Sequence, residues 1–138
     1  MKLSERIEKL IEERAKKVAK RCNYSETCWE WLTEDKLNQY YNYIRCNDVI
    51  APVILELIEE EILHPTCYTY TDDESVQFFF LATYATVLSN KGNRRLEVVL
   101  FRDRIPIKKI FASREDIIKF VEDTVKEILE TWKDFKSV

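Results

Sequence analysis

Hydrophobic side chains recur every three or four positions through the first part of the chain, which is the spacing of one face of an α-helix. The pattern predicts a helix over residues 3–22, a second over residues 33–44 and a third over residues 48–63. Pro52 is expected in the first turn of the third helix, where the missing N–H of proline costs little. The N-terminal half is therefore predicted to be helical.

In the second half of the chain the pattern changes to an alternation of apolar and polar positions, as in half-buried β-strands. The alternation predicts strands over residues 76–88, 96–100 and 105–111. The first two should form a hairpin, because Gly92 in the intervening loop can adopt the positive φ of a tight turn. A short turn at residues 102–104 is expected to join the second strand to the third.

Helical spacing returns after Ser113, which with Asp116 resembles a helix N-cap, and it continues close to the end of the chain. The predicted fold class is α+β, with a helical N-terminal half, a three-stranded antiparallel β-meander and a C-terminal amphipathic helix packed on the sheet. No repeat, low-complexity tract or linker interrupts this order. Residues 1–138 are therefore expected to form a single α+β domain.

The composition is that of a folded protein, with 46% hydrophobic and 34% charged residues. Residues 1–22 carry too many charges for a signal peptide, and no stretch approaches the roughly 18 apolar residues that span a bilayer. We therefore expect a cytoplasmic protein with no membrane association. One glycine, three prolines and many Lys, Glu and Ile residues resemble the composition of thermophile proteins.

Charge is segregated along the chain, although the net charge is only −3. Residues 1–22 have a net charge of +4, residues 23–75 of −10, residues 76–112 of +5 and residues 113–138 of −2. Two basic segments thus flank an acidic middle. Complementary surfaces of this kind steer association between proteins or between copies of one chain.

Cys22, Cys28, Cys46, Cys67 and His64 together offer enough thiolate and imidazole ligands for a tetrahedral zinc, and the cysteines could instead form a disulfide. Of the cysteines, only Cys67 lies close to His64 in the sequence. Structural zinc sites usually contain two cysteines separated by two residues, and no such pair occurs here. Buried free thiols are the interpretation that we favour, with a disulfide as the next. No metal site and no cofactor are predicted.

The sequence lacks the motifs of common enzymes. His64 is the only histidine and precedes a proline, where a structural role is natural. Glycine-rich phosphate loops, nucleophile elbows and zinc-protease motifs are absent. A metal-dependent nuclease using Glu97 remains an alternative, but Val99 stands where such sites place a lysine. No catalytic residue is assigned, and we do not expect an enzyme.

Nucleic-acid binding is a further alternative, because a basic hairpin and a basic first helix could contact phosphates. Three helices followed by a hairpin with a basic tip is the order found in a winged helix. The third helix, however, carries four glutamates and no base, so phosphates would repel it. The candidate contacts are Lys16, Lys17, Lys20, Arg21, Lys91, Arg94, Arg95, Arg102 and Arg104.

A protein partner or self-association is the function that we expect first. The segregated charges favour it, and aromatic residues outside the core could anchor an interface. The aromatic candidates are Trp29, Trp31, Tyr40, Tyr43, Tyr68, Tyr70 and Phe79. The sequence thus predicts a small binding or regulatory protein, with nucleic acid and then a nuclease-like activity as alternatives.

Overall fold

The computed structural model describes residues 1–25 and 27–137. The helices α1 (Leu3–Cys22), α2 (Cys28–Thr33) and α3 (Gln39–Tyr43) come first, and a π-helical segment, η1 (Ile44–Ile50), leads into α4 (Ala51–Ile58). The strands β1 (Pro65–Thr71), β2 (Ser75–Ser89) and β3 (Gly92–Pro106) follow, and α5 (Ile107–Ile110) and α6 (Arg114–Lys136) end the chain. The predicted α+β class is confirmed.

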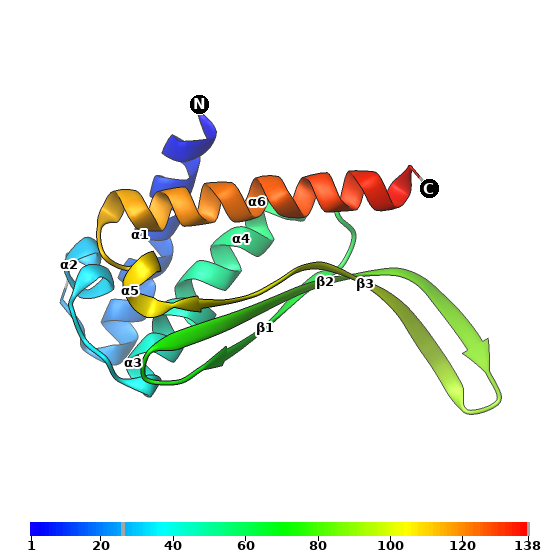
Figure 1. Cartoon of the computed structure of the whole chain (residues 1–138), viewed down its shortest axis with the longest axis horizontal. Coiled ribbons are helices and arrows are strands. Elements are labelled where there is room, and N and C mark those ends of the chain that lie inside the picture. The colour runs from blue at the N-terminus through cyan, green and yellow to red at the C-terminus, as the bar shows by residue number, and fades with distance from the viewer. Residues whose placement is uncertain (26, 138) are drawn as a thin grey trace.

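The strands form one antiparallel sheet in the order β1-β2-β3, so the predicted meander is also confirmed. The helices α1, α4 and α6 lie on one side of this sheet, with the long α6 running above β3 (Figure 1). The core lies between the sheet and these helices. Phe78 and Phe80 of β2, Ile54 of α4 and Val121 of α6 are all completely buried there.

The predicted strands have the wrong boundaries. The third strand of the sheet is β1, which precedes the hairpin, and the segment predicted as a strand over residues 105–111 is mostly α5. Ile107 and Ile110 are buried, which is helical spacing, and the backbone N–H of Ile107 donates to the carbonyl of Glu74 (2.8 Å). The predicted turn at residues 102–104 lies inside β3.

The hairpin turn is tighter than the sequence indicated. Ser89 pairs directly with Gly92, so only two residues lie between the strands. Gly92 has a φ of 107°, a conformation that favours glycine, as expected for the only glycine of the chain.

The second and third predicted helices form one continuous helical run in which α3, η1 and α4 follow without a break. Pro52 lies in the first turn of α4, but it has no N–H to donate to the carbonyl of Asp48 four residues earlier. The Nε of Arg14 in α1 donates to that carbonyl instead (2.9 Å), and Arg21 forms an ion pair with the Asp48 carboxylate (2.7 Å). Helix α1 therefore supports the helical run at its proline.

Arg45 of η1 is a buried charge, with 1% of its surface exposed. Its Nη2 donates to the carbonyls of Trp31 (2.9 Å) and Glu34 (2.5 Å), at the end of α2 where helical carbonyls lack backbone partners. The guanidinium lies 4.3 Å from the ring centre of Tyr41 and 5.3 Å from that of Phe111. Burial lowers the pKa of Arg45 from its usual value. Arg45 thus joins α2, η1 and the segment after α5.

No helix within residues 1–25 and 27–137 combines the length and the apolar character that crossing a membrane requires.

The substitution Arg45→Met should lower the free energy of unfolding by about 2–4 kcal/mol, because each buried carbonyl left without a donor costs about 1–3 kcal/mol. Arg45→Lys, which keeps the charge but cannot donate in a planar fork, should lower it by less. Urea denaturation followed by circular dichroism measures both variants. A methionine variant as stable as the wild type would show that Arg45 does not hold these elements together.

Candidate functional site

The side of the sheet that faces away from the helices carries a row of large side chains. Tyr68 of β1 pairs with Phe79 of β2, which pairs on its other side with Arg102 of β3. Directly paired residues point to the same face of a sheet, and adjacent strands lie about 4.8 Å apart. The Arg102 guanidinium lies 5.3 Å from the ring centre of Phe79. Two aromatic rings and a guanidinium therefore stand next to one another across all three strands.

A second row on this outer face, two residues along each strand, repeats the pattern. Tyr70 pairs with Gln77, and Gln77 pairs with Arg104. The Nη2 of Arg104 donates to the Asp72 carboxylate (2.7 Å), and its Nε donates to the Ser75 hydroxyl (3.1 Å). This row thus adds one aromatic ring and a guanidinium that the β1–β2 turn holds in place.

Asp72 organises that turn. Its carboxylate accepts hydrogen bonds from the backbone N–H groups of Glu74 (2.8 Å) and Ser75 (2.7 Å), and these bonds are the main reason why its pKa falls to about 2. The Ser75 hydroxyl and Arg104 lower the pKa further. Asp72 therefore stays charged and keeps Arg104 oriented at any pH above about 4.

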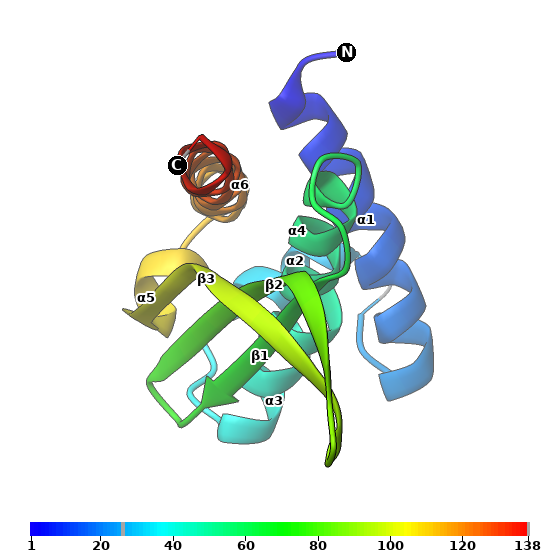
Figure 2. The same ribbon diagram turned by 90° about the vertical axis from the view of Figure 1, so that its right-hand side faces the viewer.

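Helices leave the outer face uncovered. Figure 2, turned from Figure 1, shows α4, α1 and α6 together on the opposite side of the sheet. Tyr68 is 53% exposed and Tyr70 64% exposed. Single exposed apolar residues are common on protein surfaces, but a cluster of exposed aromatic rings indicates a binding surface.

Arg95 extends this surface toward the hairpin. It pairs with Thr86, and together with Thr66, Thr83 and His64 it lines a shallow cavity of about 410 Å³. The remaining predicted bases of the hairpin, Lys91 and Arg94, are exposed near its turn.

The predicted basic contacts separate into two groups. Lys16, Lys17 and Lys20 are exposed on α1, and Arg21 is engaged by Asp48. Helix α1 lies far from the hairpin in Figure 1, at the other end of the longest axis of the molecule. The strand bases Arg95, Arg102 and Arg104 are brought together on β3, and the helix bases do not join them.

The predicted aromatic anchors separate as well. Trp31 is buried in the core, and Trp29 packs against it. Tyr40 and Tyr43 are exposed on α3, and thus lie on a helix and not on the strands. Tyr68, Tyr70 and Phe79 lie on the outer face of the sheet. The sequence analysis named these three residues but did not predict the strand β1, which the alternation over residues 66–70 could have indicated.

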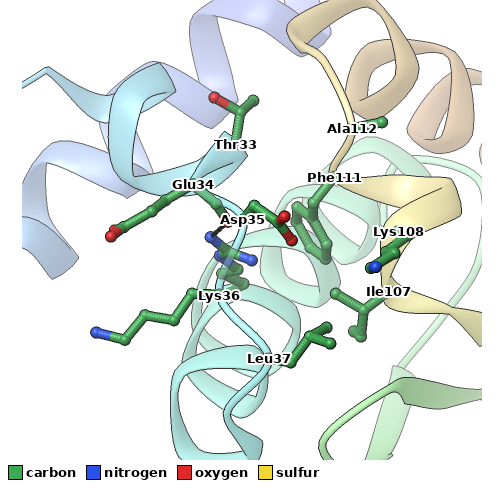
Figure 3. A pocket seen from close by; sticks show the side chains of 10 residues that line it. Thr33, Glu34, Asp35, Lys36, Leu37, Ile107, Lys108, Phe111 and Ala112 are labelled. Carbon is green, nitrogen blue, oxygen red and sulfur yellow. Dashed lines mark hydrogen bonds between the residues drawn. The ribbon is translucent and has the colours of Figure 1, made fainter.

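A cavity of about 300 Å³ lies beside Arg45 between α2 and α5, and Figure 3 shows its walls. The Asp35 carboxylate points toward the ring of Phe111, and Lys108 lies across from it, whereas Glu34 and Lys36 extend to the other side of their segment. The Nε of Arg45 is buried and has no hydrogen-bond partner in the described part of the chain. The walls of the cavity contain both acidic and basic residues, so they do not form a site of one charge.

Glu97, the residue considered for a nuclease, pairs with Thr83 in β3 and is exposed. Among residues 1–25 and 27–137, no three His, Cys, Asp or Glu side chains gather as a metal ion would require. The four cysteines are free; Cys28 and Cys46 are buried, and Cys22 and Cys67 are partly exposed.

Comparison of the chain with protein-family models, with curated protein sequences and with solved structures gave no match.

The thiols of Cys46 and Cys67 should resist alkylation by iodoacetamide in the native protein at pH 8. Burial raises the pKa of both thiols, to about 12 for Cys67, so the reactive thiolate is scarce. Mass spectrometry of peptides after timed labelling measures the rates, and denatured protein is the control in which all four cysteines react. Labelling of Cys46 as fast in the native as in the denatured state would contradict the burial.

Proposed function

We propose that the protein binds single-stranded nucleic acid on the outer face of its sheet. The observation that supports this most directly is the row of Tyr68, Phe79 and Arg102 across three uncovered strands. Proteins that bind single strands combine aromatic rings, on which bases stack, with cations that follow the phosphates. Both components are present on one face here.

Stacking supplies the affinity in this proposal. The face of any base can stack on an aromatic ring or on a guanidinium, and each stacked base contributes about 1–3 kcal/mol. Tyr68 and Tyr70 are the exposed rings, and Arg102 next to Phe79 extends the platform by one strand. Bases inside a duplex are already stacked on one another, so the surface favours single strands.

The distribution of charge supports the same proposal. Arg95 and Arg102 are seven residues apart on β3, which corresponds to roughly 20 Å of strand, so they could contact different phosphates of one strand. Glu97 is the acidic residue between them on this strand. The glutamates that argued against a winged helix lie on α4 and directly after it, and α4 lies on the far side of the sheet (Figure 2).

A protein partner, the function that the sequence favoured first, would use similar residues, because tyrosine and arginine are also enriched at protein interfaces. The two functions differ in their dependence on salt. Phosphate contacts release counterions, so nucleic-acid affinity falls steeply as salt rises, in proportion to the number of contacts.

Fluorescence anisotropy with labelled DNA and RNA single strands tests the proposal. We expect single strands to bind more tightly than the matching duplex, and Tyr68→Ala and Tyr70→Ala each to weaken binding by about 5- to 150-fold, the equivalent of one lost stacked base. Arg102→Ala should also reduce the slope of log affinity against log salt by about one unit for a lost phosphate contact.

The matched control is the double variant Lys16→Ala and Lys17→Ala on α1, which removes two exposed cations from the far end of the molecule. It should change the affinity less than twofold if the outer face of the sheet is the site. Circular dichroism checks that each variant is folded. Failure of both DNA and RNA single strands to bind, or an equal loss in the α1 variant, would refute the proposal.

A further inference from the structure

The distal part of the β2–β3 hairpin, residues 85–96, is an unsupported arm. β1 pairs with β2 only as far as Ala82, so beyond this point the hairpin is a ribbon of two strands that projects from the body (Figure 1). An isolated two-stranded ribbon is marginally stable in water. Leu88 is 82% exposed and Val87 46% exposed on it. A partner surface that covers the arm would stabilise the two-stranded ribbon and would bury its exposed apolar side chains.

The charge of the arm restricts what that partner can be. Lys91, Arg94 and Arg95 lie close to its turn, and residues 85–96 contain no acidic residue. Two such arms pairing edge to edge would bring like charges together, which is one way in which proteins prevent strand edges from associating. A protein surface that complements the arm is therefore acidic.

The chain itself carries an acidic surface of this kind at the end of α4. Glu56, Glu59, Glu60 and Glu61 are exposed there, and the last three follow the C-terminus of the helix, where the helix dipole disfavours negative charge. Glu60 is paired with Arg6 (2.9 Å). For Glu56, Glu59 and Glu61 we find no ion pair among the described residues.

Next to these glutamates lies an open groove of about 620 Å³ between the α4 end and α6. Leu129 and Trp132 form its apolar part, Glu61 and Glu130 lie on it, and Lys133 and Lys136 complete its wall. The Nε1 of Trp132 is buried without a hydrogen-bond partner among the described residues. An apolar side chain of the arm could fill this groove while the arm bases meet Glu59 and Glu61.

Within one chain the two surfaces cannot meet. The turn of the arm points away from the end of α4 in both Figure 1 and Figure 2. A second copy, in contrast, offers one groove to the arm and one arm to the groove. A twofold axis between the copies would make the two contacts equivalent and close the pair.

We propose that the protein forms a homodimer in which the arm of each copy docks on the acidic end of α4 in the other copy and on the groove beside it. The groove itself carries two acids and two bases, so the charge that attracts the arm comes from the exposed glutamates at the end of α4. Arg94 and Lys91 of the arm meet Glu59 and Glu61, and Leu88 or Val87 enters the apolar part of the groove. Tyr68, Phe79 and Arg102, the row proposed to bind nucleic acid, take no part in this contact. Arg95 of the arm is shared with the proposed nucleic-acid site. The dimer is therefore tested at Lys91 and Arg94, and the nucleic-acid site at Tyr68 and Tyr70.

Sedimentation velocity of the protein, freed of nucleic acid and followed over a range of concentrations, tests the dimer. The wild type should be dimeric at low salt and should dissociate as salt rises. Reversal of the arm charges by Lys91→Glu and Arg94→Glu should yield monomers, and so should reversal of the groove charges by Glu59→Lys and Glu61→Lys. Each pair should raise the dissociation constant at least tenfold.

The decisive variant carries all four substitutions, because its arm and groove are again complementary. We expect this chain to recover the dimer, which a merely misfolded variant would not do. The control pair Lys16→Glu and Lys17→Glu on α1 should remain dimeric. The proposal would be overturned by a monomeric wild type or by a dimer that survives reversal of the arm charges. A quadruple variant that stays monomeric would also overturn it.

Discussion

The guanidinium of Arg45, buried against Tyr41 and Phe111, joins the helical half of the molecule to the end of its sheet. Its two hydrogen bonds to backbone carbonyls hold the end of α2, and its contact with Phe111 fixes the segment that follows α5. Because α5 directly follows β3, this cluster connects the helical N-terminal half to the end of the sheet. The helices α1, α4 and α6 lie on one side of the strands, and the other side is open.

The charges that are segregated along the sequence lie on different elements of the fold. Four of the seven bases of the segment 76–112 lie on β3, one lies in the hairpin turn and two lie on α5. The described acids of the segment 23–75 lie on α2, η1, α4 and the loops, with three of them in the turn between β1 and β2. Arg21 and Arg104 were counted as free bases from the sequence. In the structure they form ion pairs with Asp48 and Asp72, so they help to hold the fold together.

The sequence predicted the parts of this structure that depend on local periodicity. The face of α1, the long strand β2 and the amphipathic α6 were all evident from the spacing of apolar residues. The segment 105–111 was assigned wrongly because Ile105 and Ile107 alternate, while the helical spacing of Ile107 and Ile110 reaches over too few residues to be distinctive. The role of Arg45 was not predictable, since a buried arginine has no periodicity and its carbonyl partners come from another helix. The row across Tyr68, Phe79 and Arg102 required the strand register, which a sequence pattern does not provide.

Nucleic-acid binding by the outer face of the sheet, as we propose, can be mapped residue by residue by nuclear magnetic resonance. Amide signals of ¹⁵N-labelled protein are followed while an unlabelled single strand is added. We expect the signals of Tyr68, Tyr70, Phe79 and Arg102 to shift together and to saturate at one strand per site. The signals of Lys16, Lys17 and Lys20 on α1 should stay in place. Shifts confined to α1 or to α3, or no shifts at all, would contradict the proposal.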